Sequence, residues 1–171
     1  MDFAYNDEQK EIIKVVRDLV EKEIVPYASE MDETGKLHEG LLEKLAAQGL
    51  LGVAIPEEFG GAGLDAITIA AIYEELGKGC AGVATTVAAN ALASYPVIIA
   101  GNDDQKKRYF DIINDDNLAA FALTEPGTGS DAGSVSTRAM KTEDGKGYIL
   151  NGTKCFITNG ALAEVFVVFA N

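Results

Sequence analysis

The hydrophobic pattern of the chain changes its period once, at the acidic segment of residues 114–117. Before this segment, apolar residues recur every three or four positions, as on one face of a helix. After it, apolar and polar positions alternate, and β-branched and aromatic residues become frequent, as in strands. Because the two patterns are segregated, they predict an α+β fold rather than alternating βαβ units. We expect an all-α helical bundle domain over residues 1–116 and an incomplete antiparallel β-domain over residues 117–171.

Five helices are expected in the first part of the chain. Asn6 and Gln9 stand three residues apart before an apolar periodic run, which is the pattern of a capping box at a helix start. The segment of residues 50–64 holds one proline and several glycines, and is predicted to be a loop. The expected helices begin near Asn6, Leu37, Asp65, Gly82 and Asp103 or Asp104, and the first four end or kink near Pro26, Gly49, Gly77 and Ala100.

Five strands are expected after the change of period. They cover residues 118–124, 134–141, 148–150, 155–158 and 165–170. The last strand, VFVVFA, is an apolar run with no further strand after it to serve as a partner. We therefore expect the sheet to end in an unpaired apolar edge, which favours self-association.

The composition limits the classes of partner. The 171 residues are 47% hydrophobic and carry a formal net charge of −13, which fits a globular, acidic protein. A field of this sign repels phosphate backbones and anionic lipid, so nucleic acid and membrane surfaces are poor candidate partners. Residues 117–171 are nearly neutral, with five acidic and four basic side chains, and they hold the candidate site motifs.

Three further features bear on location. Cys80 and Cys155 match no metal-ligand spacing, and no metal site is expected. Both are interpreted as buried thiols, which suits a reducing cytoplasm. The N-terminal residues lack the basic start and the apolar run of a signal peptide. Residues 79–102 are uncharged and long enough to cross a bilayer, but Asn90 and many small side chains favour a buried core helix. We therefore expect a cytoplasmic protein.

The densest motif is FALTEPGTGSDAGS, at residues 121–134. Its three glycines are spaced GxGxxxG and precede a strand pattern, which argues against a dinucleotide-binding fingerprint. A strand that runs into a glycine-rich turn can present backbone N–H groups as an anion-binding nest. Thr124 and Ser130 add hydroxyl donors that suit a phosphate or the polar edge of a ring. A plain hairpin turn is the alternative interpretation.

A second motif is NGTKCFITNG, at residues 151–160. It places Phe156 and Thr158 two residues apart, on one face of a predicted short strand. An aromatic face beside a hydroxyl can hold a flat heterocycle by stacking and by hydrogen bonds to its edge. The same pair is also typical of a core residue followed by a turn, so both interpretations stay open for this motif alone.

Taken together, the motifs resemble the acyl-CoA dehydrogenase family. The resemblance rests on ALTEPGTGSDAGS, on the upstream PEEFGGAGLD and on the downstream YILNGTKCFITNG, which occur in the family's order, and it extends over the entire chain. It implies a flavoprotein with an N-terminal helical domain, a middle β-domain and a C-terminal helical domain, usually assembled as a tetramer. It further implies that this chain holds the first domain and the opening strands of the second.

The resemblance also implies which residues bind FAD. Residues 121–130 match the family's first FAD-contacting strand and turn, and residues 156–158 match its second. The implied set is Phe121, Leu123, Thr124, Gly129, Ser130, Phe156, Ile157 and Thr158, and Ser130 would also contact acyl-CoA.

Each part of this set has an implied role. The Thr124 hydroxyl and the Leu123 backbone would bond the pyrimidine edge of the flavin, and Thr158 would bond N5. Fixed donors at these places stabilise the charge that a flavin gains on reduction. Phe156 stands where many relatives have Trp and would back the ring, whereas Phe121 stands where others often have Tyr.

The implied reaction is the α,β-dehydrogenation of an acyl-CoA thioester to 2-enoyl-CoA. In the family, a glutamate of the C-terminal domain removes the α-proton while the β-hydrogen passes to the flavin as a hydride, and electron-transferring flavoprotein is the expected acceptor. No catalytic residue is therefore assigned within this chain, and the isolated chain is expected to be inactive.

An acidic side chain in a TEPG turn is typical of a backbone-bonding or exposed group, so Glu125 is not assigned as a base. His38, the one histidine, lacks a Ser or Cys partner pattern and is interpreted as structural.

Two alternatives stay open. An acyl-CoA oxidase or a flavin monooxygenase of the same fold differs in how oxygen reaches the reduced flavin, which the sequence does not determine. A non-catalytic helical interaction module, whose β-segment only completes its core, belongs to a different class. The preferred acyl chain length is not readable, although the small side chains of residues 82–100 favour room beside the expected helix.

Overall fold

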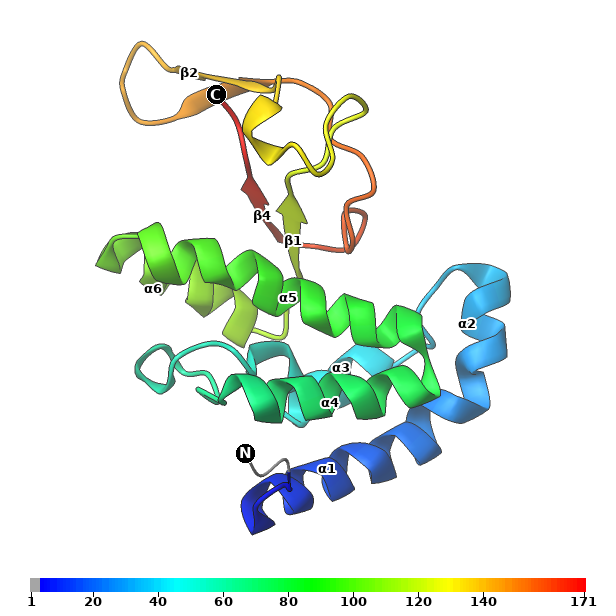
Figure 1. Ribbon diagram of the computed structural model, residues 1–171. Coiled ribbons are helices and arrows are strands. Elements are labelled where there is room, and N and C mark those ends of the chain that lie inside the picture. The colour runs from blue at the N-terminus through cyan, green and yellow to red at the C-terminus, as the bar shows by residue number, and fades with distance from the viewer. Residues whose placement is uncertain (1–3) are drawn as a thin grey trace.

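The computed structural model describes residues 4–171 and shows a helical part followed by short strands (Figure 1). The helical elements are α1 (Asp7–Leu19), the π-helical turn η1 (Val20–Ile24), the 3-10 turn η2 (Val25–Tyr27), α2 (Ala28–Thr34), α3 (Leu41–Ala47), the 3-10 turns η3 (Leu50–Gly52) and η4 (Glu57–Phe59), α4 (Ala66–Gly79), α5 (Ala81–Ala100) and α6 (Asp103–Asn114). The strands are β1 (Ala119–Ala122), β2 (Arg138–Lys141), β3 (Tyr148–Asn151) and β4 (Val165–Val168), with the 3-10 turn η5 (Ala132–Ser134) between the first two.

Side-chain caps begin two of the helices as predicted. At α1, the Asn6 side chain accepts a hydrogen bond from the Gln9 amide, and the Gln9 side chain accepts one from the Asn6 amide. At α4, the Asp65 carboxylate accepts from the amides of Ile67 and Thr68. Each bond satisfies an amide that has no partner within its own helix, which is why these helices begin where they do.

Other helix boundaries differ from the prediction. The expectation that Asp103 or Asp104 caps α6 is wrong, because Asn102 is the N-cap and forms a reciprocal capping box with Gln105. The two aspartates lie in the first turn instead, where their negative charges interact favourably with the positive end of the helix dipole. α3 is shorter than expected because Gly40, with a left-handed φ of 75°, precedes it. The sequence pattern does not predict α2, whose segment ASEMDET has no helical hydrophobic repeat.

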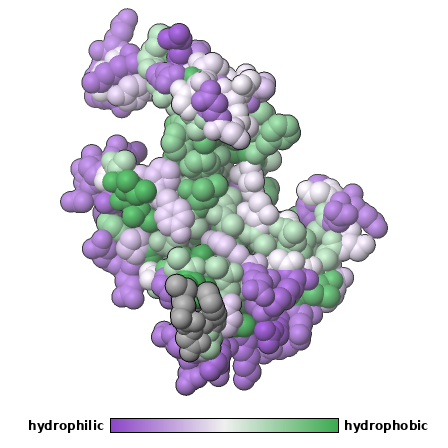
Figure 2. Space-filling model, viewed as in Figure 1, coloured by the Kyte–Doolittle hydropathy of each residue, from purple (hydrophilic) through white to green (hydrophobic). Residues whose placement is uncertain are grey.

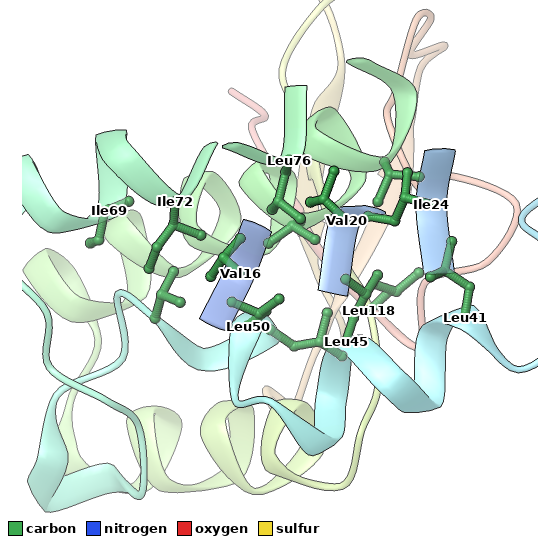
Figure 3. Close-up of a cluster of buried hydrophobic side chains, with 14 of the residues drawn as sticks. Val16, Val20, Ile24, Leu41, Leu45, Leu50, Ile69, Ile72, Leu76 and Leu118 are labelled. Carbon is green, nitrogen blue, oxygen red and sulfur yellow. The ribbon is translucent and has the colours of Figure 1, made fainter. Parts of the chain in front are cut away.

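The main core of the helical part is built from apolar side chains of α1, η1, α3, η3, α4 and α5 (Figure 3). Leu45, Leu76 and Val87 are fully buried in it, and Leu118 adds to it from the residue before β1. Burial of each such side chain contributes on the order of 2 kcal/mol relative to exposure. Since Leu118 belongs to this core, the first strand leaves the helical part in a fixed place.

Among residues 4–171, α5 alone is long and apolar enough to cross a membrane, judged by length and composition only. In the structure it packs against α4 and β1. Its fully buried Asn90 donates to the carbonyl oxygens of Leu51 and Asn117 and accepts from the Ala119 amide. One face of the helix is thus buried in the core and ties the helical part to the start of β1, whereas the opposite face is exposed, so the predicted burial holds for one face only.

The strands form one antiparallel and one parallel pair. β2 and β3 are antiparallel, with Arg138 opposite Asn151. β1 and β4 are parallel, with Ala119 opposite Val165, so the expected antiparallel arrangement holds for one pair only. The parallel pair arises because the chain makes a long excursion through the β2–β3 hairpin before it returns beside β1. β4 therefore has a partner strand on one side, and its other edge has none within residues 4–171, which agrees with the expected unpaired edge.

Residues 155–158 are not a strand, which contradicts the prediction. Phe156 has a left-handed φ of 56°, which interrupts an extended backbone. β2 also begins later than predicted, because Ser136 and Thr137 donate their amides to the Glu125 carboxylate. Hydrogen bonds to one buried side chain thus occupy these two amides, while the Asn171 amide donates to the Thr137 carbonyl oxygen at 2.9 Å.

Candidate functional site

The two sequence motifs meet at the end of β1. The Cys155 amide donates to the Thr124 carbonyl oxygen at 3.0 Å. Lys154 Nζ donates to the Leu123 carbonyl oxygen at 2.9 Å. The structure therefore brings the two segments together, as the sequence analysis expects. Figure 2 shows that hydrophobic surface gathers in the middle of this face, where β1 and β4 meet the helices, whereas the hairpin end and the α1 side are hydrophilic.

The first segment turns tightly after β1. Glu125 and Thr128 exchange backbone hydrogen bonds of 2.9 and 3.0 Å around a two-residue turn, as in the hairpin alternative. None of the three glycines within residues 127–133 has a positive φ, so a nest of alternating right- and left-handed residues does not form. Gly129 and Ser130 are exposed, and their amides have no hydrogen-bond partner among residues 4–171. They can still donate to a ligand, although not from a concave nest.

The second segment presents an aromatic side chain to the outside. Phe156 is 93% exposed, and its left-handed backbone turns the side chain away from the protein. The prediction that it shares a strand face with Thr158 is therefore wrong. The hydroxyls of Thr124 and Thr158 make no hydrogen bond within the described part of the chain, so both are available as donors.

Asn159 fixes the second segment to the rest of the molecule. Its side chain is buried, and its φ of 62° lies in the left-handed region that asparagine tolerates. Its side-chain amide donates to the Thr86 carbonyl oxygen in α5 at 3.0 Å and to the Ala119 carbonyl oxygen in β1 at 3.1 Å. The loop before β4 is thus held by one side chain against a helix and a strand.

Glu125 is the most heavily hydrogen-bonded side chain of the site. One carboxylate oxygen accepts from the amide and the hydroxyl of Ser136, and the other accepts from the amide and the hydroxyl of Thr137 and from Lys154 Nζ at 2.8 Å. The carboxylate is 2% exposed. The hydrogen bond from Lys154, followed by those from Ser136 and Thr137, holds the pKa of Glu125 well below its ordinary value. The group is backbone-bonded, as the sequence suggests, but it is buried rather than exposed.

The sequence patterns do not predict the roles of Lys154, Asn159 and the two hydroxyl residues that bind Glu125. A signal for the lysine is present, because the charged side chains of the first motif, Glu125 and Asp131, are both acidic, whereas Lys154 is the one charged side chain of the second. If the two motifs converge and bury Glu125 and Lys154, these two charges have to pair, because an unpaired buried charge is strongly destabilising. The role of Asn159 depends on carbonyl groups that are distant in the sequence, so no local pattern predicts this role.

Two other predicted FAD-binding residues lie at the margins of this surface. Phe121 is partly buried in β1, and its ring packs on Phe169 with centroids 4.9 Å apart. Ile157 lines a groove of about 1000 Å³ that is also bordered by the α2–α3 connection and by Gly82 and Thr86 of α5. Space is therefore available beside the second segment, next to the start of α5.

The remaining candidates have structural surroundings. His38 stacks on Tyr27 with ring centroids 3.5 Å apart, and its Nδ1 lies 3.6 Å from a Glu30 carboxylate oxygen. Cys80 and Cys155 are free thiols that are half-buried, not fully buried as predicted, since each borders a loop.

Comparison with known families gives two matches that together span most of the chain. The family model described as the acyl-CoA dehydrogenase N-terminal domain matches residues 6–114. The model described as the acyl-CoA dehydrogenase middle domain matches residues 120–171.

Individual relatives agree with these matches. An acyl-CoA dehydrogenase of Bacillus subtilis is 41% identical over 95% of this chain and 43% of its own length. A 3-(aryl)acrylate reductase of Clostridium sporogenes is 42% identical over 95% of this chain and 44% of its own length. A structure of an acyl-CoA dehydrogenase from Bacillus anthracis, complexed with FAD, superposes with a TM-score of 0.87 and 39% identity over 98% of this chain and 29% of that chain. The chain thus spans less than half the length of the relatives it matches.

Proposed function

Because the chain belongs to the acyl-CoA dehydrogenase family, we propose that it forms part of an FAD-dependent enzyme that dehydrogenates acyl-CoA thioesters to 2-enoyl-CoA. In this proposal residues 1–116 are the N-terminal helical domain, and residues 117–171 are the first strands of the middle domain. The proposal assigns no catalytic base to these residues.

The observation that carries the proposal is the meeting of the two motifs at the end of β1. The meeting supports a site with donors on one side and an exposed aromatic ring on the other. Thr124 and Thr158 supply hydroxyls without protein partners, and Phe156 supplies the ring. This donor set fits the polar edge and the flat face of a flavin.

Each residue has a proposed task. Thr124 and the Leu123 amide would donate to the pyrimidine edge of the flavin, since the Leu123 carbonyl is already bonded to Lys154. Thr158 would donate to N5, and Phe156 would back the ring. Phe121 and Ile157 would pack beside the cofactor, and the free amides of Gly129 and Ser130 would serve the pyrophosphate, with Ser130 also near acyl-CoA. When bound, FAD supplies a hydride acceptor for the β-hydrogen of the substrate.

The outward face of α5 supports an acyl-binding role. Leu92, Tyr95 and Ile99 follow one another at helical spacing and are 49%, 43% and 82% exposed. Ala88 stands one turn before Leu92 and leaves room beside it. An apolar stripe of this kind suits an acyl chain, and we assign it to one wall of the substrate site.

The proposal extends to partners. An electron-transferring flavoprotein is the proposed electron acceptor, and a tetramer is the proposed assembly. The free thiols of Cys80 and Cys155 support a reducing, cytoplasmic location.

The test uses a protein that contains residues 1–171 together with the further segments that its relatives possess. We expect it to be purified with FAD bound, and a saturated acyl-CoA to reduce the flavin without oxygen while 2-enoyl-CoA forms. Comparing oxygen with an electron-transferring flavoprotein as acceptor separates a dehydrogenase from an oxidase or a monooxygenase.

Two variants test the assigned hydroxyls. Thr124→Val and Thr158→Val remove one donor each at nearly constant volume, and each should weaken FAD binding or slow flavin reduction by about tenfold. Thr34→Val removes a hydroxyl that bonds only within α2 and should leave both unchanged. A wild-type protein without FAD, or a flavin that acyl-CoA does not reduce, would contradict the proposed function.

A further inference from the structure

We propose that the buried pair of Glu125 and Lys154 positions the flavin-binding donors, by locking the two motifs to each other and to the start of β2. The inference rests on the proposed function and goes beyond it, since neither residue is assigned there to contact the cofactor. Both act as positioning residues, through the backbone of Leu123 and Thr124.

The pair is buried on both sides. The Glu125 carboxylate is 2% exposed and the Lys154 side chain 12% exposed, and 2.8 Å separates Nζ from Oε1. Ion pairs at the surface contribute little, whereas removal of one partner from a buried pair leaves an uncompensated charge. Here the two partners come from different motifs, so their pairing acts between segments and not within one turn.

Lys154 bonds the backbone as well as the carboxylate. Its Nζ donates to the Leu123 carbonyl oxygen at 2.9 Å, and the neighbouring Cys155 amide donates to the Thr124 carbonyl oxygen at 3.0 Å. The carbonyl groups of Leu123 and Thr124 are therefore both held from the side of the second motif. The orientation of the Leu123 amide and of the Thr124 side chain follows from these two bonds.

Glu125 adds the third segment. Its carboxylate collects two hydrogen bonds from Ser136 and two from Thr137, at distances of 2.5 to 2.9 Å. These residues directly precede β2. The single carboxylate thus joins its own segment at the end of β1 to the start of β2 and to the second motif, and loss of its charge weakens both junctions together.

The same bonds argue against a catalytic role for Glu125. A base needs a carboxylate oxygen that reaches the substrate proton, and here the two oxygens are occupied by five protein donors and shielded from solvent. A base also works best with a pKa near the working pH, and the surroundings of this group move its pKa the other way.

The experiment measures FAD affinity, the visible flavin spectrum and the flavin reduction potential in the FAD-containing protein. Glu125→Gln and Lys154→Met should each weaken FAD binding by about tenfold or more and alter the spectrum and the potential, because the donors lose their fixed positions. The double variant should lose less than the product of the two single losses, since both remove one interaction. Lys154→Arg keeps the charge and should retain most of the affinity.

Glu75→Gln is the matched control. Glu75 is a buried carboxylate of α4 that bonds Arg17 and Lys78, so its loss also removes a paired charge, but one whose partners lie in α1 and α4 and in neither motif. It should lower the melting temperature and leave FAD affinity, spectrum and potential unchanged. If Glu125→Gln does not fold, Ser136→Ala, which removes one hydroxyl donor to Glu125, should show the same effects to a smaller degree.

Three results would overturn the inference. The first is an unchanged FAD affinity and spectrum in the Glu125 and Lys154 variants. The second is a loss of turnover in Glu125→Gln while its flavin properties stay normal. The third is a loss of FAD affinity in Glu75→Gln as large as that in Glu125→Gln. A wild-type protein that holds no FAD would instead overturn the proposed function, and this inference with it.

Discussion

Phe156 combines two features that a folded chain usually avoids. Its ring is 93% exposed, and its backbone has a φ of 56°, where a bulky side chain is strained. Within the described residues, burial of the ring does not offset the cost of this backbone conformation. Strained, exposed residues of this kind mark places where a ligand uses the side chain.

A glycine at this position should separate strain from function. We expect Phe156→Gly to keep or raise the stability of the apoprotein, by up to about 1 kcal/mol, because glycine adopts a positive φ without strain. The same variant should weaken FAD binding, because the aromatic face is gone. Chemical denaturation and FAD titration measure the two effects, and Phe156→Ala, which keeps Cβ and the strain, is the control. A clear loss of stability in the glycine variant would show that the ring has a structural role.

Single residues were predictable from the sequence where their partners are local. Asn6 and Asp65 cap helices through amides two or three positions away, so a short pattern contains the whole interaction. The side chains of Glu125 and Asn159 bond groups 11 or more positions away. The candidate site residues are selected by sequence motifs and stay predictions, whereas the residues that hold their segments in place have no local pattern that would select them.

Among the elements, β4 has one edge that no described residue covers. Within residues 4–171 it pairs with β1 alone, and Phe166 and Val168 are 45% and 36% exposed. A groove of about 740 Å³ lies beside it, bordered by the end of α5 and by α6. Unpaired apolar edges invite further strands.

We therefore expect residues 1–171 to self-associate as the concentration rises, through β4. Phe166→Lys places a charge on the exposed side of the edge and should shift the chain toward monomer. Ile99→Lys changes an even more exposed apolar residue on α5 and should have a smaller effect. Light scattering across a concentration series measures the difference. A sharp monomer at high concentration, without any substitution, would contradict this expectation.

The elements also show where sequence patterns stop being informative. The helix α5 and the strands β2 and β3 are predicted by the sequence because helical period and short strand alternation are local properties. The parallel pairing of β1 with β4 is decided by how the chain returns after the hairpin, which no local pattern specifies. The β1 strand is nevertheless placed well, since the apolar run at residues 118–122 is buried against the helices.

Over the whole molecule, two buried carboxylates make the fold sensitive to acid. The hydrogen bond from Arg17, followed by that from Lys78, lowers the pKa of Glu75 to about 2, and the pKa of Glu125 is lowered as well. A carboxylate with a lowered pKa in the folded state stabilises the fold above its unfolded pKa of 4.5, and this contribution is lost as the pH falls toward the folded value. One such group lies in the helical part and one beside the strands.

We expect the melting temperature to be nearly constant from about pH 8 to pH 6 and to fall below about pH 5. Protonation of surface carboxylates also relieves repulsion within a chain of net charge −13, which acts in the opposite direction. Comparison with Glu75→Gln isolates the buried group, because this variant should start lower at neutral pH and lose less on acidification. An equal acid loss in both proteins would show that Glu75 makes no contribution.

Asn159 links the helix that is proposed to bind the acyl chain to the segment that is proposed to bind the flavin. One amide group holds the backbone of α5 at Thr86 and the backbone of β1 at Ala119, and it directly follows Thr158. Under the proposed function, a substitution that shifts α5 to admit a longer acyl chain would also displace this amide, and with it the Thr158 hydroxyl beside it. Substrate range and flavin reduction potential would then be coupled through Asn159, so an evolutionary step that alters one would have to be compatible with the other.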